Sequence, residues 1–150
     1  GLFGEAGQPN YSAAKEGVVG FTRSCARALG RYGVTCNCIA PGAATRMMDR
    51  VPGMAAGEGQ PLPSEVAAGT GRDPANVVPL IIYLASDEAD YVSGRAFRAT
   101  GYKIAMYSEP VEEKVIWWDK PYWDVDRLFE VFKNTLGQGL SLPGARVDMS

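Results

Sequence analysis

A helical stretch that leads into a short apolar segment and a Pro-Gly pair is the feature that most constrains the fold of this chain. From Tyr11 to Leu29, apolar and small residues recur at helical spacing, which predicts a helix of about five turns. Gly30 and Gly33 end this pattern, and "VTCNCIA", residues 34–40, has the length and composition of a buried strand. A helix, a glycine turn, a buried strand and a Pro-Gly loop are together typical of a parallel α/β sheet.

Residues 43–72 form a long stretch without strong periodicity. The stretch is rich in Gly, Ala, Pro and Ser, and it indicates either a functional flap or a disordered excursion. Met47, Met48 and Met54 lie within it, and methionine offers adaptable apolar contact to a ligand but also fills irregular cores. Both interpretations of the methionines stay open.

Regular structure is predicted again after this stretch. Asp73 and Pro74 have the residue types of a helix start, and they precede a largely apolar helix over 75–89 that Pro79 should bend near its beginning. The remaining predicted elements are strands at 95–99 and 103–107 separated by Gly101, an amphipathic helix over 125–136 ended by Gly137, and a poorly ordered tail from 138 to 150.

Length and charge restrict the class of protein. A chain of 150 residues suffices for one domain, and its 15 basic and 17 acidic residues occur without runs. It therefore has no electrostatic footprint for nucleic acid or anionic lipid, and small molecules are the expected partners. No apolar run reaches the roughly 20 residues that span a bilayer, and nothing resembles a signal peptide. We expect a cytoplasmic protein that binds neither nucleic acid nor a membrane.

The cysteines are Cys25, Cys36 and Cys38, and the chain contains no histidine. An odd number of cysteines without histidine argues against a disulfide framework and against the usual zinc sites. We expect buried, reduced thiols and no metal site.

The motif "PNYSAAK" places Tyr11 and Lys15 four residues apart near the start of the predicted helix. This spacing puts both side chains on one helix face, about 5 to 6 Å apart at Cβ. A phenol with an unperturbed pKa of about 10 is a poor acid-base catalyst at neutral pH, but a nearby ammonium and the positive helix end favour its ionised form. Such a tyrosine can donate a proton to a carbonyl. The alternative is a half-buried tyrosine beside a solvated lysine.

The segment "GQPNYSAAKEGVVGFTRSCARALGRYGVTCNCIAPG" resembles the C-terminal half of the short-chain dehydrogenases/reductases. "GLFGEAGQPNYSAAK", "IAPGAATRM" and "SGRAFRATGYKIAMYSEP" are similar to one branch, the (3R)-hydroxyacyl-CoA dehydrogenase domains of multifunctional enzyme type 2 and their bacterial relatives. The resemblance covers residues 1–110 and implies the C-terminal half of a doubly wound, Rossmann-type parallel sheet whose N-terminal strands are absent from this chain. Residues 111–150 would be a C-terminal extension with one amphipathic helix.

The resemblance implies roles for two catalytic residues. Tyr11 matches the family's proton donor or acceptor, and Lys15 matches the residue that favours its ionised form and hydrogen-bonds the nicotinamide ribose. The implied reaction is a hydride transfer between NAD or NADP and C3 of a 3-hydroxyacyl or 3-oxoacyl thioester, or a similar secondary alcohol or ketone.

The resemblance also implies a cofactor-binding turn. Pro41, Gly42 and Ala43 match the turn beside the nicotinamide, and Thr45 matches the hydroxyl that meets the cofactor's amide or diphosphate region. The chain has no Gly-rich phosphate loop of the dinucleotide-binding kind. We expect that loop, and the family's catalytic Ser and Asn, to lie upstream of Gly1, so the chain alone should be inactive.

Two further expectations concern assembly. The resemblance implies a homo-oligomer for the full-length form. A different class of function stays open, namely a non-catalytic remnant that acts as a dimerising or interaction module. The aromatic stretch "VIWWDKPYW", residues 115–123, agrees either with such a contact or with a tail that wraps its own domain.

Overall fold

The computed structural model describes residues 4, 7–50 and 59–141, and the chain divides into two compact units, Gly1–Ser108 and Glu109–Ser150. The first unit contains α1 (Pro9–Leu29), η1 (Gly30–Tyr32), β1 (Cys38–Gly42), η2 (Met48–Arg50), η3 (Pro74–Val77), α2 (Val78–Leu84), η4 (Asp87–Ala89), β2 (Ala96–Thr100) and β3 (Lys103–Met106), and the second contains α3 (Val125–Phe132).

Helix α1 confirms the helix predicted from the spacing of apolar residues. It begins at Pro9, whose missing N–H is one that a helix start leaves unpaired in any case. It ends through the 3₁₀ turn η1 at Gly33, whose φ of 72° favours glycine. Val19 and Thr22 are buried, whereas Phe21 is 67% exposed. The helix therefore covers the sheet with one face only.

The three strands form one mixed sheet in the order β1-β2-β3. Strands β1 and β2 are parallel, as the sequence predicts, whereas β3 is antiparallel to β2. Only Gly101 and Tyr102 separate β2 from β3, and so short a connection can join only antiparallel neighbours. Within the described part of the chain, no strand pairs with the other edge of β1.

Strand β1 begins later than predicted and includes the Pro-Gly pair that was expected in a loop. The residues before it are held by side chains instead of by a strand ladder. Asn37 Nδ2 donates a hydrogen bond to Val92 O at 2.8 Å, and Arg95 N donates one to Asn37 Oδ1 at 3.1 Å. Pro41 can occupy a strand whose outer edge carries no ladder, because it has no N–H to donate.

The helix predicted over 75–89 is divided into shorter pieces. Asp73 caps η3 by accepting a hydrogen bond from Ala75 N at 2.8 Å, which confirms the predicted helix start. Pro79 lies in the first turn of α2, so the helix begins there and the preceding residues form a 3₁₀ turn. Where a bend in one helix was expected, the chain changes from the 3₁₀ helix η3 to the α-helix α2.

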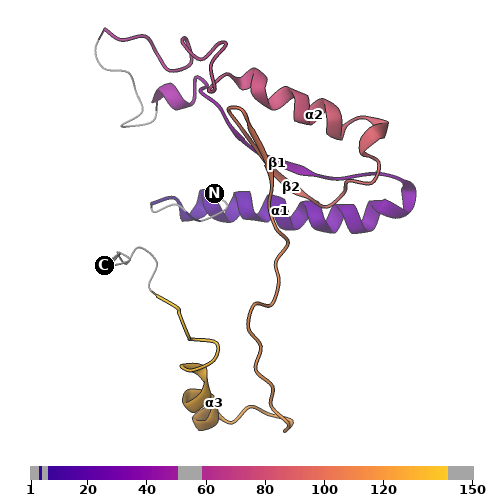
Figure 1. Cartoon of the computed structure of the whole chain (residues 1–150), viewed down its shortest axis with the longest axis vertical. Helices are drawn as coiled ribbons and strands as arrows, with labels where there is room; N and C mark the ends of the chain where they lie inside the picture. Colours follow the sequence, from indigo (N-terminus) through magenta and orange to yellow (C-terminus); the bar gives the residue numbers. More distant parts are fainter. Residues whose placement is uncertain (1–3, 5–6, 51–58, 142–150) are drawn as a thin grey trace. The chain divides into compact units, whose positions relative to one another are not determined.

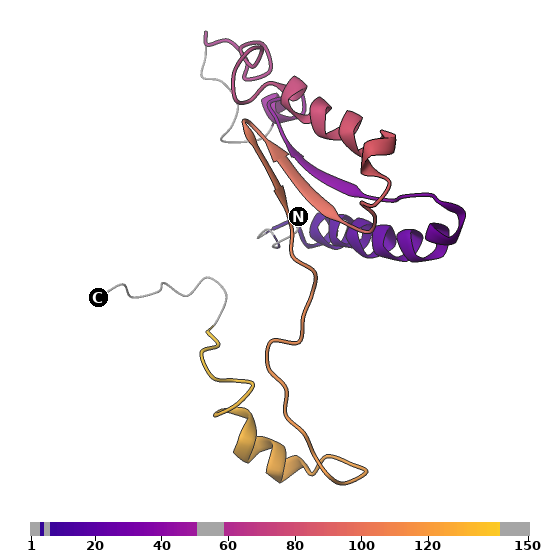
Figure 2. The same cartoon turned by 45° about the vertical axis from the view of Figure 1, so that its right-hand side comes forward.

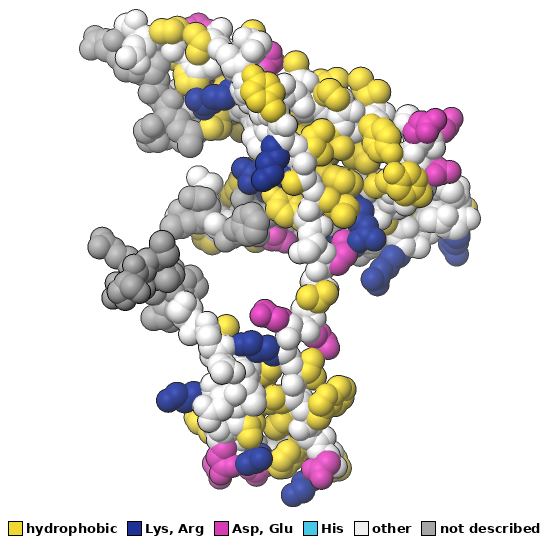
Figure 3. All heavy atoms as spheres, viewed as in Figure 1, with side chains coloured by type: hydrophobic (Ala, Val, Ile, Leu, Met, Phe, Trp, Pro, Cys, Tyr) yellow, Lys and Arg dark blue, Asp and Glu magenta, His cyan; other side chains and the backbone are white. Residues whose placement is uncertain are grey.

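Helices α1 and α2 lie on opposite sides of the strands (Figure 1), and Figure 2 shows the same layers from a second direction. The buried positions are filled mainly by small residues, including Ala44, Ala89 and Ala99. Larger apolar side chains such as Ile82 remain exposed, and Figure 3 shows hydrophobic side chains gathered over α2 and the strands. None of the helices in the described part of the chain is long and apolar enough for a membrane span.

In the second unit, Asp124 caps α3 by accepting a hydrogen bond from Arg127 N at 2.8 Å. The helix ends at Phe132, four residues earlier than predicted, because Gly137 N turns back to donate to Phe132 O at 2.7 Å. The tail that was predicted to be poorly ordered lies mostly outside the described residues.

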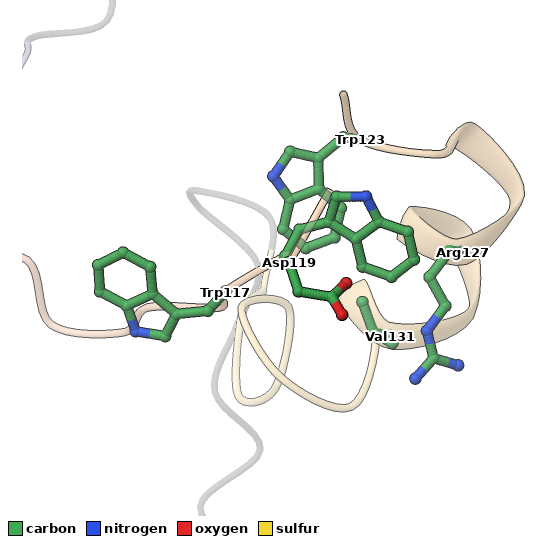
Figure 4. A pocket seen from close by; sticks show the side chains of 6 residues that line it. Trp117, Asp119, Trp123, Arg127 and Val131 are labelled. Carbon is green, nitrogen blue, oxygen red and sulfur yellow. The ribbon is translucent and has the colours of Figure 1, made fainter. Parts of the chain in front are cut away.

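The aromatic stretch before α3 packs partly against itself. Trp118 and Trp123 stack with ring centroids 5.3 Å apart, whereas Trp117 is 89% exposed. Figure 4 shows Trp123, Asp119 and Arg127 around a hollow of about 340 Å³ within this unit.

Gly42 is required by the close approach of β1 and β2. A Cβ built on Gly42 would lie 2.9 Å from Thr100 Cβ, and Thr100 Oγ1 donates a hydrogen bond to Gly42 O at 3.1 Å. We predict that Gly42→Ala lowers stability by about 1 to 3 kcal/mol, because the strands must separate. Denaturant midpoints measure this change.

A matched control for this variant is Gly30→Ala at the C-cap of α1. The backbone of Gly30 is helical, with a φ of −54°, and a Cβ there meets nothing within 4 Å, so the substitution should leave stability unchanged or raise it by up to about 1 kcal/mol through helix propensity. Equal effects of the two substitutions would contradict the packing argument.

Candidate active site

The start of α1 and the strands beside it enclose a groove of about 460 Å³. The side chains that matter for its chemistry are Tyr11, Lys15 and Val18 from α1, Pro41 from β1, Arg98 from β2, and Tyr107 after β3.

Tyr11 and Lys15 lie one helical turn apart on the groove face of α1. Lys15 Nζ is 5.4 Å from the centroid of the Tyr11 ring, which is a cation-π distance. Tyr11 is the third residue of α1 and is 48% exposed, so a ligand can reach its hydroxyl near the positive end of the helix. The predicted shared face is confirmed. The Tyr11 hydroxyl can exchange a proton with a ligand, and the Lys15 ammonium beside it can donate a hydrogen bond to a ligand hydroxyl.

Of the three residues predicted for the cofactor turn, only Pro41 lines this groove. Gly42 packs against β2 instead, as described above. Ala43 leads to Ala44, which is buried and whose N–H donates to Arg72 O at 2.8 Å. This hydrogen bond ties the end of β1 to the far end of the predicted flap.

Thr45 lies in a separate hollow of about 430 Å³, with Arg46, Ser64 and Asp73 in its wall. The structure therefore does not bring Thr45 into the groove of Tyr11 and Lys15. A local spacing of three residues after Gly42 could not predict this, because the chain turns away from β1 at this point.

The described parts of residues 43–72 form hydrogen-bonded turns. Asp49 accepts hydrogen bonds from Ser64 N at 3.0 Å and from Ser64 Oγ at 2.5 Å, which joins the two arms of the predicted flap. Met47 is 81% exposed and Met48 is half-buried, and Met54 lies outside the described residues.

Arg98 and Tyr107 are groove residues that the sequence analysis missed. A signal was present for Arg98, because it is a charged residue between the apolar Phe97 and Ala99 of a strand. Among the described residues that line the groove, Lys15 and Arg98 are cations and no carboxylate occurs. The groove therefore favours an anionic or hydroxyl-rich ligand.

A metal site is a different matter. In residues 4, 7–50 and 59–141, no three His, Cys, Asp or Glu side chains are grouped so as to hold a metal ion.

Asp73 has the best-defined electrostatic environment near the Thr45 hollow. Hydrogen bonds from Ala75 N and then from Gly69 N, at 2.8 and 2.7 Å, hold the pKa of this carboxyl below its ordinary value.

The depressed pKa predicts a pH dependence of stability. The ionised Asp73 stabilises the fold above the ordinary pKa of a carboxyl, and this contribution is lost as the pH falls through the lower folded-state pKa. Asp73→Ala should lower the denaturant midpoint at neutral pH and weaken the dependence of the midpoint on acid pH. Asp87→Ala, which removes an exposed carboxylate, is the control. Identical curves for both variants would contradict the role of Asp73.

The chain is similar to several known proteins. Residues 2–101 match the family model described as Enoyl-(Acyl carrier protein) reductase. The chain is 40% identical to the hydroxyacyl-CoA dehydrogenase ChsB1 of Mycobacterium tuberculosis over 85% of its length, and 37% identical to the (3R)-3-hydroxyacyl-CoA dehydrogenase of Homo sapiens over 67%. It is 40% identical to the 3-oxoacyl-[acyl-carrier-protein] reductase FabG of Vibrio harveyi, again over 67%.

A solved structure, a short chain dehydrogenase from Mycobacterium avium, matches 90% of the chain with a TM-score of 0.64 and 33% identity. The chain belongs to the short-chain dehydrogenase/reductase family, which confirms the resemblance and the fold class. It spans 38%, 38% and 41% of the three curated relatives and 39% of the solved chain.

The length of these matches shows whether they include residues of the second unit. The matches to the two mycobacterial proteins cover more residues than the first unit holds, so they extend into Glu109–Ser150. At least part of the second unit therefore has a counterpart in dehydrogenases of this family.

Proposed function

We propose that this chain supplies the proton-transfer part of an NAD- or NADP-dependent oxidoreductase that interconverts 3-hydroxyacyl and 3-oxoacyl thioesters. The observation that carries the proposal is the pairing of Tyr11 with Lys15 in one groove with Pro41, in a member of the short-chain dehydrogenase/reductase family. The names of the similar proteins support an acyl thioester substrate, since they specify hydroxyacyl-CoA and 3-oxoacyl-[acyl-carrier-protein].

The residues of the groove fit part of a dinucleotide. Lys15 would hold the hydroxyls of the nicotinamide ribose, and the groove offers no carboxylate to repel a phosphate-bearing ligand. No Gly-rich phosphate loop is present in the sequence, so the chain holds the nicotinamide end of the cofactor at most. A bound nicotinamide supplies or accepts the hydride at the substrate's C3.

The chain's own residues then manage the oxygen of the substrate. The Tyr11 hydroxyl donates its proton to the carbonyl oxygen in reduction and takes the proton from the alcohol in oxidation. The Lys15 ammonium, one turn further along α1, stabilises the negative charge that remains on the phenol oxygen. Pro41 contributes to the wall of the same groove and limits where the substrate can lie.

The proposal predicts separate kinetic effects for the two residues, measured in the full-length protein. Tyr11→Phe should lower kcat by about 10²- to 10⁴-fold with little change in the KM for the cofactor, because only the proton donor is lost. Lys15→Ala should lower kcat and raise the cofactor KM, because it removes a charge and a ribose contact together. Turnover of a 3-hydroxyacyl thioester with NAD and with NADP is the measurement.

Tyr32→Phe provides the matched control, since Tyr32 is a 66% exposed tyrosine outside the groove. If Tyr11→Phe retains wild-type turnover like Tyr32→Phe, the Tyr–Lys pair is a helix surface and the catalytic proposal fails. A full-length protein without turnover on either cofactor would favour the non-catalytic interaction module.

We also propose that the full-length form is a homo-oligomer built on the open face of α1. Phe21 is 67% exposed, and a Cβ added to Gly17, one turn earlier on the same face, meets nothing within 4 Å. Small residues beside an exposed aromatic permit the close approach of a second helix across a two-fold axis.

Light scattering of full-length variants tests this face. Phe21→Glu should reduce the mass of the wild-type oligomer to that of a smaller species, whereas Tyr32→Glu, an equally exposed position at the helix end, should leave it unchanged. A monomeric wild-type protein at micromolar concentration would contradict the proposal.

A further inference from the structure

All three cysteines of the chain face the contact between α1 and β1. Cys25 follows the buried Thr22 by three residues on the same side of α1. Cys36 lies two residues before Cys38, the first residue of β1, and both Cys25 and Cys38 are near enough to raise the pKa of the Cys36 thiol. Cys38 lines the groove together with Val18 of α1, which places Cys38 beside the helix.

The Cys25 and Cys36 side chains are neighbours, since Cys25 is one of the groups that raise the pKa of the Cys36 thiol. The backbone segments that carry Cys25 and Cys36 both pack against Gly94. Gly94 N donates to Cys36 O at 2.7 Å, and a Cβ added to Gly94 would lie 3.3 Å from Cβ of Ala26, the neighbour of Cys25. The segment before β1 and this turn of α1 thus pack against one glycine.

The thiols are half-buried, not buried as the sequence predicted, because α1 covers only one side of the strand segment. A small oxidant can therefore reach them. Burial, and after it the neighbouring Cys25, raises the pKa of Cys36, so Cys36 stays a protonated thiol at neutral pH.

We propose that Cys25 and Cys36 form a redox modification site, which a hydroperoxide oxidises to an intramolecular disulfide between α1 and the segment that enters β1. The thiolate that one cysteine forms by losing its proton to the solvent attacks a peroxide oxygen and the O–O bond breaks, which leaves a sulfenic acid and a hydroxide that takes up a proton to become water. The sulfur of the second thiol then displaces the sulfenic oxygen, which leaves as a second water while the S–S bond forms. Two thiols are oxidised by two electrons, and hydrogen peroxide is reduced to two waters.

Peptide mapping can identify this disulfide. Reduced protein is treated with hydrogen peroxide, the excess is removed with catalase, and remaining thiols are alkylated before digestion with trypsin. Arginines 23, 27, 31 and 46 separate the peptide 24–27, which carries Cys25, from the peptide 32–46, which carries Cys36 and Cys38. The expected product is a cross-link between these two peptides with one alkylated cysteine in the longer one, reversed by dithiothreitol.

Single variants assign the partner. Cys38→Ser should keep the cross-link, whereas Cys25→Ser, Cys36→Ser and Cys36→Ala should abolish it. Circular dichroism verifies that each variant keeps the helix content of the wild type. In denaturant, the wild type should lose the preference for Cys36 over Cys38, because that preference comes from the folded contact.

The thermal midpoint gives a second readout. The oxidised wild type should melt at a higher temperature than the reduced form, because the cross-link closes a loop in the unfolded chain, and Cys36→Ser should show no such shift. A cross-link that persists in Cys36→Ser, a disulfide between two chains, or full alkylation of all three thiols after peroxide treatment would each overturn the proposal.

Discussion

The parallel pairing of β1 with β2 is the interaction on which the rest of the first unit depends. The Asn37 side chain starts it by bonding to Val92 and Arg95, and the close contact of Gly42 with Thr100 ends it. These partners are more than fifty residues apart in the sequence, so the pairing closes a long loop at an entropic cost that the ladder must exceed. The pairing places the strands that form one wall of the groove beside α1.

Two kinds of element contribute side chains to the groove. Helix α1 presents Tyr11 and Lys15 at a fixed spacing, whereas the strands contribute Pro41 and Arg98. A helix controls the distance between side chains one turn apart, and a sheet controls what lies opposite them. The chain spans about two fifths of the length of its curated relatives, and the groove lies wholly within the part that it spans.

Predictions from the sequence succeeded where the signal was local. The helix ending at Gly33, the Asp73 cap and the break at Gly101 each depend on residues within a turn of one another, and each is present in the structure. The predicted lengths of β1 and α3 were wrong, because a strand begins where its partner begins and a helix ends where a competing turn such as that at Gly137 forms.

The sequence by itself determined the shared helix face of Tyr11 and Lys15 and the family to which the chain belongs, because helical periodicity and motif spacing are properties of neighbouring residues. Only the tertiary structure decided that Thr45 lies in another hollow, that Arg98 lines the groove, and that Cys25 lies near Cys36. These outcomes depend on the register of strands and on the packing of α1 against them. Contacts between residues far apart in the chain are set by that packing, which no local pattern encodes.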